Sequence, residues 1–327
     1  MDHRQLCAQA AEALAAVPAD HRPRVARLAT TAMMWSMKPS KPTATSYTPM
    51  ATISEFGGRI SDAAGNSANF ELVVTQSKIG GNGPIMANAL CGYAYRVTAI
   101  GLLGDGAIDP VFAPLAARAE EVISLGAAAS TDALEFADGK LMLGKLLPMD
   151  AVTYATLVAK LGAARLREVF ARSAGIAAVN WTMTLGMTEI WERLASEVLP
   201  GLGGERRLFF VDLADPAKRT LEDQRRGLAT LTTLQPHIDV VLGMNEMELR
   251  QVLTALDVAW PDGGSEFEQA RKGCEIVRDR LGISYAMCHL VKSAAVAWNR
   301  GGAKDSACAD GFFEAKPKIT TGAGDHF

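Results

Sequence analysis

Apolar residues recur along this chain in two alternating patterns. Short runs rich in β-branched and aromatic residues predict buried strands, and longer stretches with apolar residues three or four positions apart predict amphipathic helices. The predicted strands cover residues 96–100, 176–180, 208–212 and 238–242. The predicted helices cover residues 154–172, 188–198, 221–234, 246–256 and 267–281. Strands buried on both faces and separated by helices indicate an α/β fold with a doubly wound, mostly parallel sheet.

Two regions interrupt this alternation. Residues 132–147 have the pattern of a β-hairpin with Asp138-Gly139 at its turn, because this dipeptide favours tight turns. Residues 69–76 predict one more strand outside the alternation. We expect these two regions to form a small β-sheet lid over the carboxyl edge of the main sheet, where open α/β sheets bind their ligands.

The composition limits the class of protein. With 327 residues, of which 49% are hydrophobic and 21% charged, the chain can bury the core of one large α/β domain. The net charge of −3 gives no reason to expect a nucleic-acid partner. Five scattered cysteines without C-x-x-C spacing argue against disulfides and zinc, and predict a cytoplasmic protein. No apolar run is long enough to span a bilayer, and residues 6–17 predict an amphipathic helix rather than a signal peptide.

The last residues of the chain place a glycine-rich turn beside an acid. Gly322 and Gly324 flank Ala323, and two such glycines permit positive φ and leave room for a ligand. The amide hydrogens that follow Thr321 can therefore converge on an anion. Asp325 could accept a proton from an alcohol while these amides hold a phosphoryl group. The alternative is an ordinary loop in which Asp325 caps a helix.

A second glycine-rich turn, Gly80-Gly81-Asn82-Gly83, precedes a helical pattern over residues 85–93. Its glycines permit close approach of the backbone to a ligand, and the amide of Asn82 can donate to and accept from sugar hydroxyls. An ordinary turn between a strand and a helix explains the same residues.

Polar residues also follow two of the predicted strands. Asn245 and Glu248 have the spacing of a helix capping box, and they could instead hold Mg²⁺ through its water molecules at the carboxyl end of the strand. In the segment 212–219, Lys218 and Arg219 could face a triphosphate, although solvated surface charge is the commoner role of such pairs.

These motifs, in this order on an alternating α/β chain, resemble the PfkB (ribokinase-like) carbohydrate kinases from about residue 47 to residue 327. The resemblance implies a ribokinase-like α/β domain with a β-sheet lid, ATP and Mg²⁺ as cofactors, and a sugar as substrate. It also implies no membrane or nucleic-acid partner and a possible homodimer through the lid. Residues 41–327 would form this domain, with lid strands within about 47–78 and 130–147, and residues 1–40 would form a helix and an atypical first strand.

The resemblance assigns a role to each motif. Asp325 would be the catalytic base, and the amides of Gly322, Ala323 and Gly324 would form the anion hole for the γ-phosphate. Gly80, Gly81 and Asn82 would bind the sugar. The nucleotide phosphates would bind Thr321 and Asn245, and Mg²⁺ would bind through Asn245 and Glu248.

Two departures from the family pattern keep other functions open. The stretch 24–37 has no acidic residue to hold sugar hydroxyls and, with Arg27 inside it, predicts a poor central strand. The chain also ends two residues after Asp325, so we expect the C-terminal part of the fold to be missing, in a fragment or a degenerate member. The alternatives are a catalytically inactive sugar- or nucleotide-binding relative, or a kinase acting on a nucleoside or another small alcohol. Asp132 and Asn180 are further candidates for sugar contacts, with structural roles as the alternative.

Overall fold

The computed structural model describes residues 24–29, 32–42 and 47–311. Its main element is a nine-stranded sheet with the order β14-β13-β12-β11-β10-β9-β1-β5-β6. Neighbouring strands from β12 to β6 run parallel, and β13 and β14 are added antiparallel. The strands are β1 (Arg24–Ala29), β5 (Arg96–Gly101), β6 (Glu121–Ser124), β9 (Gly175–Val179), β10 (Leu208–Asp212), β11 (Asp239–Asn245), β12 (Tyr285–His289), β13 (Ser293–Arg300) and β14 (Ala303–Asp310).

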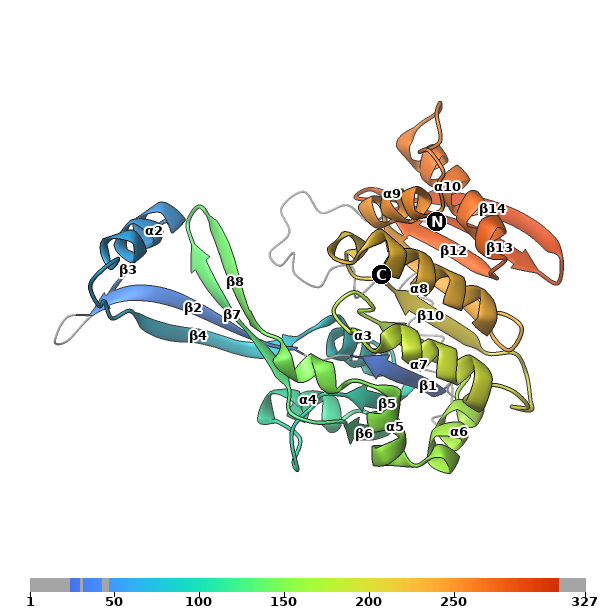
Figure 1. The fold of residues 1–327 in the computed structure, drawn as a ribbon, viewed down its shortest axis with the longest axis horizontal. Coiled ribbons are helices and arrows are strands. Elements are labelled where there is room, and N and C mark those ends of the chain that lie inside the picture. Colours follow the sequence, from blue (N-terminus) through green and yellow to red (C-terminus); the bar gives the residue numbers. More distant parts are fainter. Residues whose placement is uncertain (1–23, 30–31, 43–46, 312–327) are drawn as a thin grey trace.

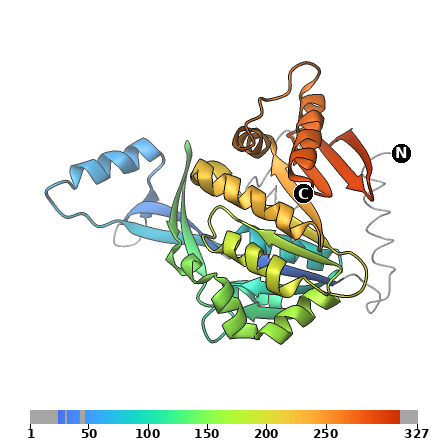
Figure 2. The same ribbon diagram turned by 45° about the vertical axis from the view of Figure 1, so that its right-hand side comes forward.

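Helices cover both faces of this sheet, as expected for a doubly wound fold (Figures 1 and 2). On one face, α3 and α4 pack against Val97 and Ala99 of β5. On the other face, α5 to α10 enclose the main core with Ile176 and Ala178 of β9. The helices are α3 (Asn82–Gly92), α4 (Ala113–Ala116), α5 (Tyr154–Leu161), α6 (Ala163–Arg172), α7 (Met187–Arg193), α8 (Leu221–Leu234), α9 (Glu246–Ala255) and α10 (Glu266–Leu281).

The predicted elements are confirmed, with two adjustments. The single helix predicted over 154–172 is two helices, because Gly162 has a φ of 77° and ends α5 before α6 begins. The helix predicted over 188–198 is α7 followed by a π-helical turn over Leu194–Val198.

The expectation that residues 24–37 form a poor central strand is wrong. Strand β1 lies between β5 and β9 and pairs in parallel with both. Arg27 is paired in register with Ala99 of β5 and Ala177 of β9. Ala26 is buried in the main core. The remainder of the stretch leaves the main sheet as the first lid strand, β2 (Ala32–Pro42).

The predicted lid is a second, smaller sheet that projects from the main domain (Figure 1). Strand β2 pairs with β3 (Tyr47–Pro49), β4 (Glu71–Gly80) and β7 (Ala129–Phe136), and β7 pairs with β8 (Gly139–Lys145). The hairpin turn is Ala137-Asp138 rather than Asp138-Gly139, since Phe136 and Gly139 are paired. The carboxylate of Asp138 accepts the amide hydrogen of Ile53 at the start of α2 (Ile53–Asp62), which packs Phe56 against Leu134.

Candidate active site

The order of the strands locates the ligand-binding edge of the main sheet. After β1 the chain adds β5 and β6 on one side, and it then adds β9, β10, β11 and β12 on the other. The direction of winding therefore reverses at β1, and ligands of open α/β sheets bind at the carboxyl ends of the strands at such a point. Because Ala29 of β1 pairs with Val179 of β9, the residue that follows β9, Asn180, lies beside this point.

The glycine-rich turn predicted at Gly80 reaches the same point from the lid. Gly80 ends β4 and pairs with Ala32 of β2, only three residues after the end of β1. Gly81 has a φ of 78°, a conformation that favours glycine, and α3 begins at Asn82. The helix thus starts three residues earlier than predicted, and Asn82 stands in its first turn.

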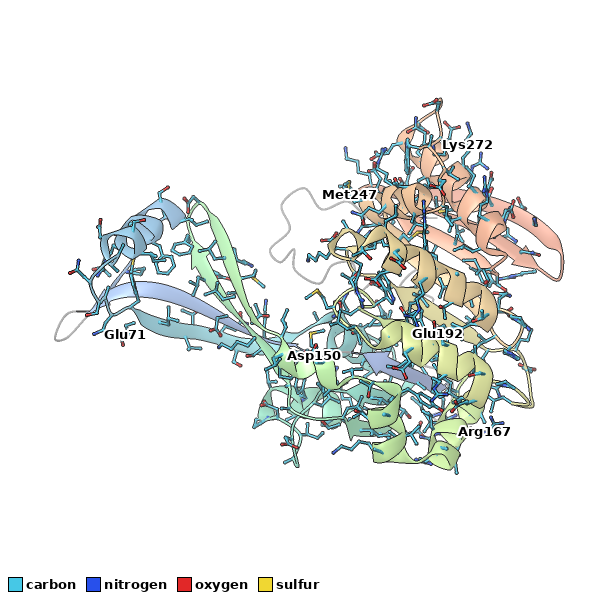
Figure 3. The ribbon with its side chains drawn as sticks, viewed as in Figure 1. Glu71, Asp150, Arg167, Glu192, Met247 and Lys272 are labelled. Atoms are coloured by element: carbon cyan, nitrogen blue, oxygen red, sulfur yellow. The ribbon has the colours of Figure 1, made fainter. Side chains whose placement is uncertain are left out.

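Asn245 and Glu248 form the predicted capping box at the start of α9. The side chain of Asn245 accepts the Glu248 amide hydrogen at 2.9 Å, and the Glu248 carboxylate accepts the Asn245 amide hydrogen at 2.8 Å. The other carboxylate oxygen of Glu248 accepts the amide hydrogen of Asp215 at 2.9 Å. The buried Glu248 side chain thus links the loop after β10 to the end of β11. Figure 3 shows this helix start at the exposed Met247.

The loop after β10 has an unusual backbone. Ala214 and Asp215 have φ values of 59° and 63°, which are unfavourable for residues with a Cβ atom. The hydrogen bond from the Asp215 amide to Glu248 holds this conformation. Lys218 forms an exposed ion pair with Asp215 at 3.3 Å, the surface role that the sequence left open for it.

Arg219 holds protein backbone. Its Nε donates to the carbonyl of Thr182 at 2.9 Å, and its second guanidinium nitrogen donates to the carbonyls of Trp181 and Thr184 at 3.1 and 2.9 Å. The guanidinium also lies 4.8 Å from the centre of the Trp181 ring. Burial lowers the pKa of Arg219, and the charge of Asp223 raises it. The sequence predicted nothing of this role, because the partners lie more than thirty positions away.

His289 ends β12 at the same edge and was not predicted either. Burial lowers the pKa of this imidazole, and the negative charge of Glu248 opposes the shift. A polar residue at the end of a buried strand is a sign of a functional edge, and the sequence contains this sign, because His289 is the last residue of β12.

The other predicted site residues have different outcomes. In the lid, buried Asp132 forms an ion pair with Lys145 at 2.7 Å, in keeping with the structural alternative. Its Oδ1 atom has no hydrogen-bond partner among the described residues. Thr321, Gly322, Ala323, Gly324 and Asp325 lie outside the described part of the chain.

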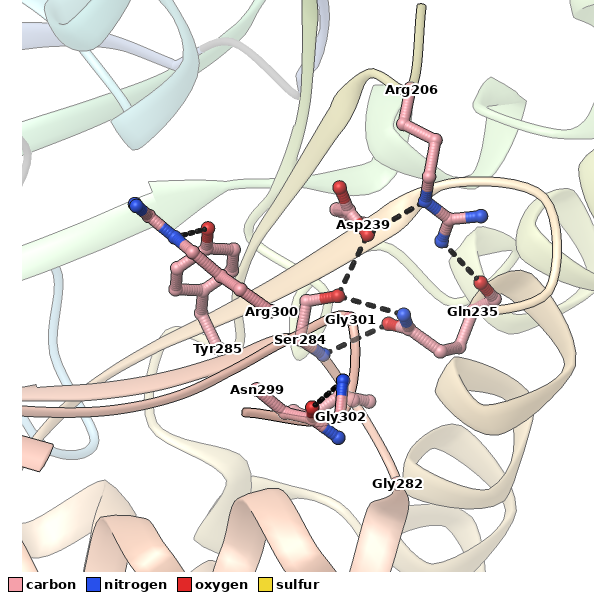
Figure 4. Close-up of a pocket in the computed structure, with 11 residues that line it drawn as sticks. Arg206, Gln235, Asp239, Gly282, Ser284, Tyr285, Asn299, Arg300, Gly301 and Gly302 are labelled. Carbon is pink, nitrogen blue, oxygen red and sulfur yellow. Dashed lines mark hydrogen bonds and ion pairs between the residues drawn. The ribbon is translucent and has the colours of Figure 1, made fainter. Parts of the chain in front are cut away.

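A pocket of about 530 Å³ lies at the opposite, amino edge of the sheet (Figure 4). It is lined by Asp239 and Tyr285, the first residues of β11 and β12, so it is separate from the carboxyl edge.

The described residues contain no group of three or more His, Cys, Asp or Glu side chains that could hold a metal ion. No helix in the described part of the chain has the length and apolar composition to cross a membrane.

Comparisons with known proteins agree with this architecture. The model of the prokaryotic ketohexokinase family matches residues 12–327. A ketohexokinase of Haloferax volcanii is 26% identical over 286 residues, which are 87% of this chain and 73% of that protein. The structure of Arabidopsis thaliana ribokinase complexed with ribose and ATP is similar with a TM-score of 0.57, at 15% identity, over 93% of this chain and 83% of that one.

Phosphofructokinase-2 of Escherichia coli, in complex with substrates and products, has a TM-score of 0.54 at 13% identity, over 93% of this chain and 83% of that one. These two structural likenesses establish the fold, and the resemblance to PfkB sugar kinases found in the sequence is confirmed. The protein belongs to the prokaryotic ketohexokinase family, a family of sugar kinases with the ribokinase-like fold.

Proposed function

We propose that this protein transfers the γ-phosphoryl group of ATP to a hydroxyl of a sugar, with a ketohexose as the first candidate substrate. The choice of sugar rests on the family and on the name of the Haloferax volcanii relative. The observation that carries the proposal is the common position of two motifs. The Gly80 turn and the Asn245–Glu248 pair both stand at the carboxyl edge of the main sheet, at β1 and at β11.

In the proposed reaction, the sugar oxygen forms a bond with the γ-phosphorus as the bond to the β-phosphate oxygen breaks, and ADP leaves. Asp325 takes the proton of the attacking hydroxyl. The amides of Gly322, Ala323 and Gly324 stabilise the negative charge of the transferring group, and Asn82 orients the sugar. Phosphoryl transfer depends mainly on positioning and charge neutralisation, so these few groups suffice.

Mg²⁺ would neutralise the phosphate charges of bound ATP. Both carboxylate oxygens of Glu248 already accept backbone amide hydrogens, so direct coordination through this residue does not fit. A carboxylate oxygen has a second lone pair, and the arrangement fits contact through a metal-bound water. We therefore assign Glu248 and Asn245 to outer contacts with the metal and Asn245 and Thr321 to the nucleotide phosphates.

The test is turnover of the variant Asp325→Asn with ATP and D-fructose. We expect kcat to fall by about 10³-fold, because the base is lost while sugar binding remains. Sugar binding is followed by the shift of melting temperature on addition of the sugar. Asp310→Asn, at the exposed end of β14, is the matched control. Turnover within tenfold of the unmodified protein would remove Asp325 from the mechanism.

One observation favours a second candidate, a sugar-binding relative without catalysis. Strand β1 contains no acidic residue, whereas the PfkB carbohydrate kinases that the sequence resembles usually hold sugar hydroxyls with an aspartate at the end of their first strand. This candidate predicts a melting-temperature shift with sugar or ATP but no ADP release from the unmodified protein. A nucleoside that stabilises the protein more than any hexose would instead favour a nucleoside kinase.

We also propose that the lid forms a homodimer. Leu72 and Val74 of β4 and Leu143 of β8 are 39%, 49% and 51% exposed, which is unusual for large apolar side chains on one small sheet. Val74→Asp should convert a dimer to a monomer in light scattering.

The free thiols of Cys91, Cys274, Cys288 and Cys308 agree with a cytoplasmic location.

A further inference from the structure

A turn at the carboxyl end of β9 is organised around the guanidinium of Arg219. Asn180 opens the turn with a φ of 64°, and its carbonyl accepts the Thr184 hydroxyl hydrogen at 2.8 Å. The carbonyls of Trp181, Thr182 and Thr184 all point to Arg219. Several carbonyl dipoles that converge in a buried place require a cation or several donors, and Arg219 supplies both.

The same turn is tied to the neighbouring strand. The amide of Trp181 donates to the carbonyl of Asp212 at 3.4 Å, and the amide of Thr182 donates to the carbonyl of Leu213 at 2.9 Å. Asn180 is 8% exposed and Thr184 is fully buried. A shift of the turn would break several of these contacts, and those to Arg219 hold the segment that directly follows Asn180.

Topology places Asn180 where a substrate binds. It follows β9 directly, and the register of β9 against β1 sets it beside the end of β1, where the winding of the sheet reverses. The Gly80 turn stands at the same strand end, because Ala32 pairs with Gly80. Asn180 and the turn that precedes Asn82 thus both lie beside the end of β1, and a side-chain amide can donate to one sugar hydroxyl and accept from another.

We propose that Arg219 is a positioning residue for the sugar: it fixes the turn 180–184 so that the amide of Asn180 meets a sugar hydroxyl. The proposal rests on the proposed kinase function. It assigns Arg219 to the backbone of the turn, because its Nε and one terminal nitrogen donate to carbonyl oxygens there.

The experiment compares Arg219→Ala, Asn180→Gly and the double variant in assays with D-fructose and ATP. Glycine is chosen at position 180 because it keeps the positive φ and removes only the amide. We expect each single change to raise the KM for fructose by about 10–100-fold, since small displacements of a positioning group have effects of this size. The KM for ATP should stay within twofold. The double variant should be no worse than the poorer single variant, because both changes remove one interaction.

Guanidinium ion added to Arg219→Ala should lower the KM for fructose again, which a loss of stability alone would not produce. Arg226→Ala removes an exposed arginine paired with Glu192 and is the matched control. If Arg219→Ala does not fold, Arg219→Lys replaces it, because lysine keeps the charge but loses the planar fork. Additive effects of the two changes, or a lower melting temperature with unchanged KM values, would overturn the proposal. Absence of turnover in the unmodified protein would instead refute the kinase function.

Discussion

The two edges of the main sheet use polar residues in different ways. At the amino edge, side chains pair with one another: Ser284 donates to Asp239 at 2.8 Å and accepts from Gln235 at 2.8 Å, and Arg206 binds Asp239 at 2.9 Å. These contacts surround the pocket in Figure 4. At the carboxyl edge, Glu248 and Arg219 hold backbone groups of loops that follow other strands. The first edge combines a side-chain network with backbone contacts, such as Arg206 to the carbonyl of Gln235 at 2.8 Å, whereas the contacts of Glu248 and Arg219 at the second edge hold backbone.

The backbone differs between the pocket at the amino edge and the loops at the carboxyl edge. Among the residues that line the pocket, the positive φ values belong to Gly282, Gly301 and Gly302, which adopt them without strain. In the loops after β9 and β10 they belong to Asn180, Ala214 and Asp215, in which a Cβ atom makes this conformation cost about 1–2 kcal/mol. Strain of this kind persists where the surrounding structure holds it, and it gathers at functional sites. The strain in these two loops supports a functional role for the carboxyl ends of β9 and β10.

The largest effect is expected from Glu248→Ala. The change leaves the partly buried amides of Asn245 and Asp215 without their acceptor, so we expect a loss of about 2–3 kcal/mol in the free energy of unfolding. It also releases the Asp215 loop, and turnover should fall with it. Urea unfolding and sugar-dependent ADP release measure the two effects. Glu268→Ala, in the exposed capping box of α10, is the control and should keep its activity. Unchanged turnover in Glu248→Ala would show that the loop support has no part in catalysis.

At the amino edge, Ser284→Ala should change stability alone. The buried hydroxyl serves Asp239 and Gln235, so its loss should lower the free energy of unfolding by about 1–2 kcal/mol. The KM for sugar and for ATP should remain as in the unmodified protein. A changed KM would mean that the two edges are coupled and would break the contrast between them.

A pair of opposite substitutions tests the difference in backbone strain. Gly282→Ala introduces a Cβ atom at a φ of 63° in open space, so only backbone strain acts, and stability should fall by about 1 kcal/mol at unchanged activity. Ala214→Gly removes strain at the carboxyl edge, and the flexibility of glycine in the unfolded chain offsets part of this gain. We expect the free energy of unfolding to rise by up to about 1 kcal/mol and turnover to fall. Thermal unfolding and turnover are measured on both variants. Higher turnover in Ala214→Gly would contradict a functional role of the strain.

The sequence predicted local structure better than contacts between distant segments. The capping box of Asn245 and Glu248 is confirmed, since a helix start depends on residues three positions apart. The prediction for β1 was wrong, because the strands that pair with it, β5 and β9, lie far from it in the sequence. The role of Arg219 depends on carbonyl groups that any residue could supply, so no residue pattern marks it.

The smallest expected effect concerns acid stability and His289 at the carboxyl edge. Burial lowers the pKa of its imidazole below the ordinary value of 6.5, with Glu248 acting in the opposite direction. Below pH 6.5 the unfolded chain therefore binds a proton that the folded protein does not bind, and the stability present above this pH is lost as the pH falls. His289→Gln should make the melting temperature less dependent on pH between about 6.5 and 5, whereas His237→Gln, which changes an exposed histidine, is the matched control. If bound ATP places its phosphates near this edge, the added negative charge should raise the pKa of His289 and flatten the same profile in the unmodified protein. An equal flattening by ATP in His289→Gln would assign the effect to another group.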